Sequence, residues 1–297
     1  MLFDSLMLAV AAREIEDACQ RDRVRRVLQP NYTDIYLVFR RGAIVCISAA
    51  PELCRVHLAS EVPEAAIEPT PFCQALRKHL EGAVLVRAEQ LRFDRVLFLH
   101  FSNCGGFGPE ATAALVAEPT GRLANMMLLD TTAEPDPEII ACAKHVTRRV
   151  NRYREVLPGE PYVPPPVGNR FNPRGLPQSQ LQSRLGASEG DIPLEGFLRK
   201  AFEGASSVFV AEVVCRAGLD PDASAHSLDD ESLARLHENL TRLAGLEVET
   251  SPAIYQTEIR RPFAYPVELQ HLAGEADVRP MPSLSAAMEE AARQAVE

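Results

Sequence analysis

Two opposite charges stand next to each other inside an apolar stretch of the chain, LRFDRVLFLHF at residues 91–101. If this stretch is a strand, Asp94 and Arg95 point to opposite faces of the sheet and do not pair with each other. Each then needs its own partner or water, because an unpaired buried charge costs several kcal/mol. The residue pattern leaves two interpretations open: the charges are solvated at the end of a core strand, or they contact a ligand.

Other polar residues have a structural and a binding interpretation side by side. Asp4 precedes an apolar periodic segment, where aspartate is a favoured helix N-cap. Arg77 and Lys78 lie off the apolar stripe of a predicted helix, so they face either solvent or a phosphate. Arg122 and Asn125, in TGRLANMMLLD, enter a predicted strand through a glycine turn, which turn chemistry alone explains.

No residue pattern typical of catalysis, metal binding or cofactor binding stands out, so neither an enzyme nor a bound cofactor is expected. A Ser–His–acid arrangement, a phosphate-loop motif and paired carboxylates at catalytic spacing are all missing from the sequence. The GGxG of CGGFGPE at 104–110 lacks the lysine and the helix start of a phosphate loop, and is interpreted as a flexible connection. The seven cysteines are scattered without CxxC or Cys/His spacing, which indicates neither a disulfide framework nor a metal site.

Composition predicts a globular protein with one large domain or two smaller ones. The 297 residues are 46% hydrophobic and 24% charged. No apolar run approaches the roughly 18 residues of a membrane span. The start, MLFDSLMLAVAAREIEDACQ, lacks the basic segment of a signal peptide. A cytoplasmic location without membrane contact is therefore expected.

The net charge of −10 argues against nucleic-acid binding, but the charge is unevenly distributed. Residues 1–170 carry 21 acidic and 20 basic residues, whereas the remaining residues carry 20 acidic and 11 basic ones. The first part is the one that could face a polyanion.

Periodicity predicts an α+β fold whose N-terminal region is dominated by antiparallel strands. Thr70 at an N-cap position, Pro71 after it and Gly82 at the end make a complete helix signature. A second helix is predicted at 5–20. The predicted strands are 34–40, 43–48, 54–58, 83–90, 93–101, 112–118 and 124–130.

A proline-rich segment divides the chain. LPGEPYVPPPVGNRFNPRGLP at 157–177 is too rich in proline and glycine for a helix or a strand, and predicts an extended linker that closes a first domain at residue 175. A small all-α domain is predicted at 176–256, with helices at 194–217 and 229–244 and a turn at Gly204. Such a helix-hairpin-helix unit can meet a phosphate with its turn amides, or serve for packing alone. SLSAAMEEAARQAVE starts a helix that stops in mid-pattern without a C-terminal cap, as expected of a truncated chain.

Taken together, several segments resemble the NFACT family. They are FDSLMLA, LQPNYTDIYLVFR, SAAPELCRVHL, PTPFCQALRKHLEG, LRFDRVLFLHF, GRLANMMLLD, YREVLPGEPYVPPP and YPVELQHLAGE with PSLSAAM. The family combines an NFACT-N domain, similar in fold to the N-terminal domain of formamidopyrimidine-type DNA glycosylases, with a helix-hairpin-helix domain, a coiled-coil arm and a C-terminal RNA-associated domain. The resemblance implies that this chain supplies the first two domains and, at 257–297, the start of the arm. Those glycosylases attack with an N-terminal proline, whereas this chain begins Met1-Leu2-Phe3-Asp4, so glycosylase chemistry is not expected.

The resemblance implies a role in ribosome quality control. Family members bind the large ribosomal subunit with an obstructed peptidyl-tRNA and recruit tRNA, alanyl-tRNA in bacteria, so that tails grow without a template. The expected partners are therefore tRNA and the large subunit with its nascent chain. The family residues tied to this role correspond to Asp4, Asp94 and Arg95. The further RNA-binding candidates are Arg77, Lys78, Arg122 and Asn125.

The chain departs from the family pattern at two places, and two other functions stay open. Ser5 follows Asp4 where the family usually has glycine, and the family's GRHSN appears as GRLAN at 121–125. The family's older name keeps a surface adhesin that binds fibronectin as one alternative. The other is a nucleic-acid-binding helix-hairpin-helix protein with a different role.

Overall fold

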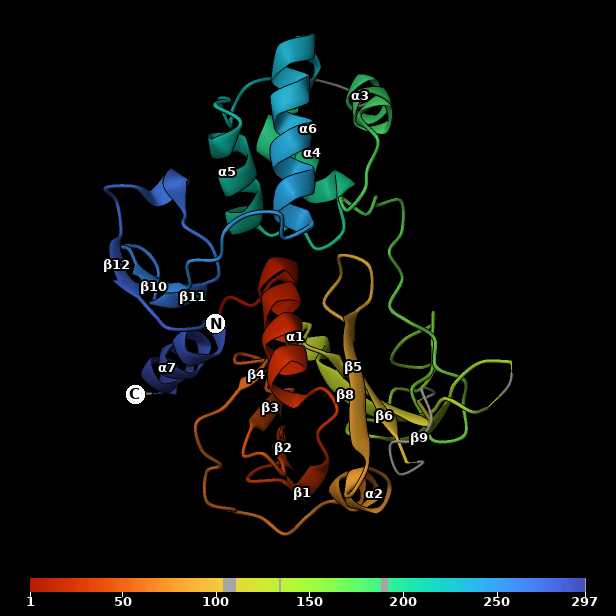
Figure 1. The fold of residues 1–297 in the computed structure, drawn as a ribbon. Coiled ribbons are helices and arrows are strands. Elements are labelled where there is room, and N and C mark those ends of the chain that lie inside the picture. Colours follow the sequence, from red (N-terminus) through yellow and green to blue (C-terminus); the bar gives the residue numbers. More distant parts are fainter. Residues whose placement is uncertain (104–110, 134, 188–191, 297) are drawn as a thin grey trace.

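The computed structural model describes residues 1–103, 111–133, 135–187 and 192–296. Figure 1 shows two antiparallel sheets beside a long helix, a group of helices at one end of that helix, and a small third sheet with the last helix. The antiparallel α+β organisation predicted from the sequence is confirmed. The GGxG motif at 104–110 lies outside the described residues.

The first sheet follows the first helix. α1 (Ser5–Cys19) leads into β1 (Val24–Leu28), β2 (Asp34–Phe39), β3 (Ile44–Ser48) and β4 (Arg55–Leu58), which pair in chain order. Gly42 allows the tight β2–β3 turn, because its φ of +99° lies in the region that favours glycine. The sequence did not predict β1, a five-residue strand with two exposed arginines.

The second sheet follows α2 (Pro71–Leu80), which begins as predicted with Thr70 Oγ1 accepting a hydrogen bond from the Cys73 amide at 3.3 Å. Its strands are β5 (Val84–Gln90), β6 (Leu97–Ser102), β7 (Ala113–Glu118), β8 (Asn125–Asp130) and β9 (Glu138–Cys142), again in chain order. The prediction that one strand covers 93–101 is wrong at its start, because residues 91–96 form the β5–β6 turn. The sequence missed β9.

The strand register brings three connections to one end of the five-stranded sheet. Leu97 pairs with Ala117, Glu118 with Asn125, and Met127 with Cys142. The β5–β6 turn, the β7–β8 connection with the 3-10 turn η1 (Gly121–Leu123) and the chain that follows β9 therefore emerge together. This edge is called the loop end of the five-stranded sheet below.

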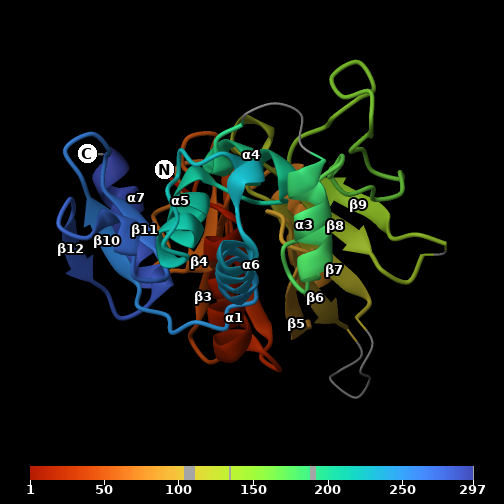
Figure 2. The same cartoon turned by 90° about the horizontal axis from the view of Figure 1, so that it is seen from above.

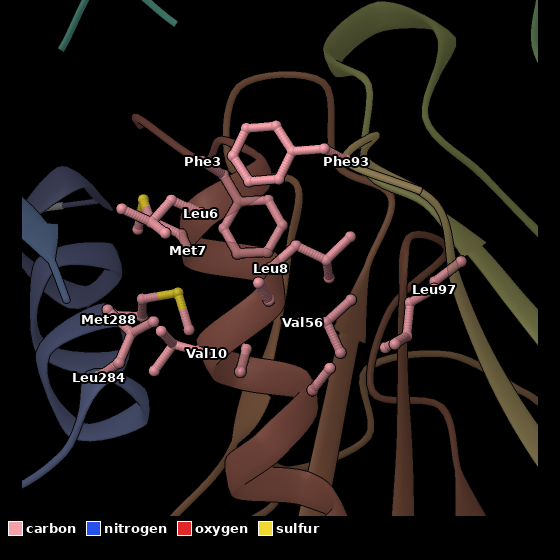
Figure 3. Packing of buried hydrophobic residues seen from close by; sticks show 14 of the residues in the cluster. Phe3, Leu6, Met7, Leu8, Val10, Val56, Phe93, Leu97, Leu284 and Met288 are labelled. Carbon is pink, nitrogen blue, oxygen red and sulfur yellow. The ribbon is translucent and has the colours of Figure 1, made fainter. Parts of the chain in front are cut away.

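The main core surrounds α1. Every residue from Ser5 to Ala12 is buried, as expected of a helix that is covered on all sides. In Figure 3, α1 side chains such as Leu8 and Val10 lie between Val56 of β4, Leu97 of β6 and Met288 of the last helix. Both sheets and the last helix therefore pack against α1 in one hydrophobic core.

A smaller core lies on the other face of the five-stranded sheet. Its members include Val96, Met127, Val156 and Tyr162, so the chain around 146–162 covers this face. Arg154 forms an ion pair with the buried Glu118, whose carboxylate also accepts a hydrogen bond from the Tyr162 hydroxyl at 2.9 Å.

The proline-rich segment 157–177 contains no helix or strand, and it runs from the five-stranded sheet to the helices. The Phe171 amide donates a hydrogen bond to the Ala201 carbonyl at 2.8 Å, and the Glu203 amide donates to the Phe171 carbonyl at 2.9 Å. Four helices follow: α3 (Gln178–Gly186), which the sequence missed, α4 (Leu194–Ala201), α5 (Ser207–Arg216) and α6 (Asp230–Ala244), with η2 (Ala225–Ser227) before α6. Figure 2 shows these helices from above, over α1 and the sheets.

The final segment differs from the predicted arm. Residues 257–283 contain the strands β11 (Phe263–Tyr265) and β12 (Asp277–Pro280), with the 3-10 turn η3 (Gln270–Leu272) between them. The two strands flank β10 (Ala253–Gln256) in a sheet of order β11-β10-β12. The α-helix of this segment is α7 (Leu284–Val296), and Glu14 of α1 accepts hydrogen bonds from the Leu284 and Ser285 amides at the start of α7. Leu284, Ala287 and Met288 are buried, because α7 packs against α1. That a coiled coil continues from α7 stays a prediction.

Candidate nucleic-acid interface

Asp94 and Arg95 lie in the β5–β6 turn rather than on a strand. The turn is closed by hydrogen bonds from the Leu91 amide to the Val96 carbonyl at 2.9 Å and from the Asp94 amide to the Leu91 carbonyl at 3.1 Å. Strand alternation therefore does not apply to the pair. Both side chains are half-buried, and Phe93 just before them is completely buried.

Two polar side chains, Gln90 and Arg174, fix the backbone of the β5–β6 turn by hydrogen bonds. Gln90 donates from Nε2 to the Ser5 and Asp94 carbonyls, both at 2.8 Å. Arg174, from the proline-rich segment, donates to the Arg92 carbonyl at 2.7 Å and to Gln90 Oε1 at 2.5 Å. Its guanidinium also lies over the Phe93 ring, 5.2 Å from the centroid. These contacts hold the turn without using the side chains of Asp94 or Arg95.

The Asp94 and Arg95 side chains differ in how far they are engaged. Asp94 Oδ1 accepts a hydrogen bond from the Arg95 amide at 2.7 Å. The Arg95 guanidinium makes no hydrogen bond or salt bridge with any residue of the described ranges, although its charge acts on the Asp4 carboxyl. A half-buried cation is thus held at the surface with its donors open.

Asp4 lies close by but inside the protein. It caps α1, with Oδ1 accepting from the Met7 amide at 3.0 Å. Oδ2 accepts from Ser206 Oγ at 2.6 Å and from the Tyr265 hydroxyl at 3.1 Å. Burial raises the pKa of this carboxyl against the opposing effect of its three hydrogen bonds. Asp4 thus ties α1 to the start of α5 and to β11.

A cleft of about 330 Å³ brings together Asp4, Asp94 and Arg95, the three residues tied to RNA binding by the family resemblance. It lies between the chain start, the β5–β6 turn, the β7–β8 connection and the turn before α5. Its lining is Met1, Leu2, Phe3, Asp4, Pro51, Cys54, Asp94, Arg95, Gly121, Arg170, Gly204, Ala205 and Ser206.

Gly204 makes this arrangement possible. Its φ is +63°, and a Cβ at this position would lie 2.1 Å from both the Phe93 carbonyl oxygen and Ser5 Oγ. The turn before α5 therefore rests directly on the β5–β6 turn and on α1. The Ser5 hydroxyl is buried there with no hydrogen-bond partner among the described residues.

The two candidates of the β7–β8 connection have different surroundings. Arg122 is exposed beside Gly121 of the cleft wall. Asn125 is buried, and its carboxamide donates to the Lys144 carbonyl at 2.8 Å and accepts from the Lys144 amide at 2.9 Å. In this structure Asn125 holds the chain that leaves β9, so it does not face the cleft.

The structure does not bring Arg77 and Lys78 to the cleft. They lie near the C-terminal end of α2, where the Arg77 Nε donates to the Val27 carbonyl at 3.0 Å. Lys78 is exposed and Arg77 is half-buried. The two are thus not equally available to a phosphate.

Sequence reasoning missed several residues that build the site. Ser206 accepts from the Phe209 amide at 3.0 Å as the N-cap of α5, and a serine ahead of an apolar helix is a signal that was present in the sequence. Glu203 is buried and paired with Arg92, and burial raises its pKa; its Oε2 has no partner among the described residues. Arg174 and Tyr265 reach the site only through the tertiary fold, which no local pattern announces.

Two classes of feature are not found within the described ranges. No group of three or more His, Cys, Asp or Glu side chains is placed to hold a metal ion. No helix there has the length and apolar character needed to cross a bilayer.

Comparison with known proteins identifies the family of this chain. The model of the NFACT N-terminal and middle domains matches residues 4–291. The chain belongs to the NFACT family. Among NFACT relatives, the Rqc2 homolog RqcH of Bacillus subtilis is 29% identical over 284 residues, which cover 93% of this chain and 46% of the relative. The Rqc2 homolog RqcH of Streptococcus pneumoniae is 30% identical over 192 residues, covering 64% of this chain and 34% of the relative. The chain thus spans about half the length or less of these NFACT relatives.

The NFACT fold is also present in solved structures. The N-terminal part of the fibronectin/fibrinogen-binding protein from Streptococcus suis aligns with a TM-score of 0.76 at 24% identity, covering 97% of this chain and 98% of that one. The predicted likeness to formamidopyrimidine-type glycosylases and the helix-hairpin-helix assignment stay predictions.

Proposed function

We propose that this NFACT chain is a ribosome-associated quality-control factor that recruits tRNA, alanyl-tRNA in particular, to the large subunit with its obstructed nascent chain. Membership of the family supports this role, because the resemblance implies it for the motifs around Asp4, Asp94 and Arg95. The observation that carries the proposal is Arg95, which stands on a turn with a fixed backbone and lines a cleft, while its guanidinium makes no hydrogen bond or salt bridge with the described residues.

The chemistry of the cleft suits an RNA loop. Unstacked RNA bases, phosphates and 2′-hydroxyls present donors and acceptors in a compact space. The open Arg95 fork can pair with a phosphate or a base edge, and the Asp94 carboxylate can accept from a base amino group. Arg122 and Arg170 are exposed around the cleft and add positive charge. Asp4 contributes by positioning the chain start and the turn before α5.

The chain acts in this proposal by binding and positioning. In this role the chain needs no cofactor and catalyses no covalent step, because the ribosome makes the peptide bond. The proposed location is the cytoplasm, where tRNA and ribosomes are found.

Arg77 and Lys78 are proposed as a second, weaker phosphate contact. Lys78 is exposed at the end of α2, and Arg77 keeps part of its guanidinium free beside the Val27 carbonyl. Because each neutralised phosphate adds roughly 0.7–0.9 to the log–log salt slope, replacing both with alanine should flatten the slope for tRNA by about one to two units. An unchanged slope would remove α2 from the RNA-binding surface.

Recovery of RNA after crosslinking in cells tests the proposed function. The wild-type protein should yield tRNA and large-subunit rRNA, and it should co-sediment with large subunits. Recovery of neither RNA, together with binding of purified fibronectin, would replace the proposal with the adhesin alternative. Recovery of another class of RNA without tRNA would favour a nucleic-acid-binding role of a different kind.

A further inference from the structure

An arginine-rich segment follows β9 at the loop end of the five-stranded sheet. Val146 and Val156 exchange backbone hydrogen bonds of 3.1 and 2.8 Å, which close the base of a loop. Inside it, the Val150 and Asn151 amides both donate to the Thr147 carbonyl, at 2.9 and 3.0 Å. Residues 147–153, TRRVNRY, are called the 147–153 loop below.

The side chains of this loop combine open cations with exposed apolar surface. Val150 is 73% exposed and Tyr153 is 58% exposed, so an aliphatic side chain and an aromatic ring both face solvent beside the arginines. Arg148 is paired with Glu155 at 3.0 Å. Arg149 and Arg152 are exposed and make no hydrogen bond or salt bridge with any residue of the described parts of the chain.

The fold anchors this loop at both ends. Arg154, immediately after it, is held by the buried Glu118 and donates to the Val163 carbonyl at 2.7 Å. Before it, Lys144 is gripped through its backbone by the Asn125 carboxamide, and its Nζ donates to the Ala49 carbonyl at 3.1 Å. Because the loop is anchored, its exposed side chains are presented at a fixed place.

That place is the same end of the sheet that carries the cleft. The pairing of Glu118 with Asn125, and of Met127 with Cys142, sets the chain after β9 beside the β7–β8 connection. There Arg122 is exposed and Leu123 is 76% exposed. The β5–β6 turn with Arg95 emerges next along the same edge. A row of cations and exposed apolar side chains thus follows the loop end, from the cleft to the 147–153 loop.

From this arrangement we infer that the 147–153 loop is a second RNA-binding element, which contacts an unpaired stretch of the same RNA that enters the cleft. Arg149 and Arg152 bind its phosphates, and Tyr153 stacks on one of its bases. The inference rests on the proposed function for its choice of RNA. Arginines beside an exposed aromatic ring are the combination that binds single-stranded nucleic acid, since every base has a face that stacks and every nucleotide carries a phosphate.

A simple acidic polymer such as polyglutamate would use the arginines but offers no base to stack on the ring. Variants of Tyr153, read together with competition by polyglutamate, therefore distinguish stacking on RNA from attraction to acidic charge alone. Replacing Tyr153 with phenylalanine keeps the stacking surface, whereas replacing it with alanine removes that surface.

The test is a titration of the full chain with total tRNA at several salt concentrations. We expect Tyr153→Ala to weaken binding about 5- to 100-fold and Tyr153→Phe to stay near wild type. Arg149→Ala with Arg152→Ala should flatten the log–log salt slope by about 1.5. The charge-matched control is Arg40→Ala with Arg41→Ala, two exposed arginines in the β2–β3 turn at the far end of the four-stranded sheet, and it should change the slope little.

The outcomes separate this inference from the proposed function. If wild type binds tRNA and Arg95→Ala weakens it while all 147–153 variants bind normally, the loop inference is overturned and the cleft stands. If wild type binds no tRNA, the proposed function itself fails. Polyuridylate should compete with tRNA for the loop, and equally strong competition by polyglutamate would overturn the choice of RNA as ligand. Thermal melting of each variant checks that the fold is intact.

Discussion

Asp4 and Arg95 line one cleft, yet their surroundings are opposite. Both oxygens of the Asp4 carboxyl are engaged, one by the Met7 amide and the other by the hydroxyls of Ser206 and Tyr265 from distant parts of the chain. Arg95 has no such partner in the described residues and lies half-buried at the surface. The residue types alone look equally suited to binding, and only their hydrogen-bond partners distinguish them. Asp4 builds the cleft, and Arg95 is left for a ligand.

If this difference is general, closely packed residues on the interior side of the cleft determine the stability of the fold, as at Asp4, Ser5 and Gly204. The cation Arg95 on its open side determines the affinity for RNA. Changes at buried contacts should therefore lower the free energy of unfolding. Changes at the open cations should leave it nearly unaltered.

The largest expected effect is that of Gly204→Ala. The new Cβ would overlap the Phe93 carbonyl and Ser5 Oγ, and a backbone carbonyl cannot move aside cheaply. We expect a loss of more than about 3 kcal/mol in chemical unfolding. Gly218→Ala is the matched control, because Gly218 has a similar φ of +65° but no atom within 4 Å of its Cβ position. It should cost only about 1 kcal/mol, and equal losses at the two sites would show that the close contact is unimportant.

Asp4→Ala should come next. It removes a helix cap and leaves the Ser206 and Tyr265 hydroxyls without their buried acceptor, for a combined loss of about 3 kcal/mol. Asp229→Ala removes an exposed N-cap on α6 that accepts from the Ser232 amide at 2.8 Å, so it should cost only about 1 kcal/mol. If Asp4→Ala melted like wild type and lost only RNA binding, Asp4 would belong to the open side of the comparison.

A third prediction concerns pH. His57 on β4 is buried beside Arg55, whose Nε donates to His57 Nε2 at 3.0 Å. Burial, and then the charge of Arg55, lower the pKa of His57 from 6.5 to about 4. A lowered folded-state pKa means that the stability is fully present above the unfolded value near 6.5 and is lost as pH falls towards 4. About 2 kcal/mol should disappear between pH 6.5 and about pH 5. Urea unfolding of His57→Gln should show a flatter pH dependence over this window, and an unchanged curve would assign the loss to other groups.

The smallest expected effect on the interior side is that of Ser5→Ala. The Ser5 hydroxyl is buried with no partner in the described residues, so its removal should be neutral or stabilise the protein by up to about 1 kcal/mol. Ser206→Ala removes a hydroxyl that donates to Asp4 and accepts from Phe209, and it should destabilise. Thermal melting of the two variants side by side would contradict this account if both shifted in the same direction.

The sequence predicted the elements well where the local signal was strong. The Thr70, Pro71 and Gly82 signature placed α2, and alternating apolar residues placed most strands. It failed for β1 and β9, which are only five residues long. It also failed for α3, because the many polar residues of QSQLQSRLG give little apolar periodicity. It also extended the strand at 97–102 back through Asp94 and Arg95, because the apolar run hides a turn that is fixed by Gln90 and Arg174 from elsewhere in the chain.

For the site, resemblance selected Asp4, Asp94 and Arg95, and the structure brings these three together in one cleft. The residue types could not say that Asn125 is buried around Lys144, or that Asp4 bonds with residues more than 200 positions away. Those facts depend on tertiary contacts that leave no local trace. The same limit hid the 147–153 loop, whose place beside the cleft follows only from the strand register.

The most direct test of the central claim measures tRNA affinity and thermal stability together for Arg95→Ala. Because Arg95 has no partner in the described residues, its loss should change the free energy of unfolding by less than about 1 kcal/mol. Loss of its charge-assisted hydrogen bonds to RNA should weaken binding by about tenfold or more. A variant that melts like wild type but binds tRNA at least about tenfold more weakly is the predicted result. A variant that unfolds easily yet binds tRNA with wild-type affinity would contradict the claim that Arg95 is held open for RNA.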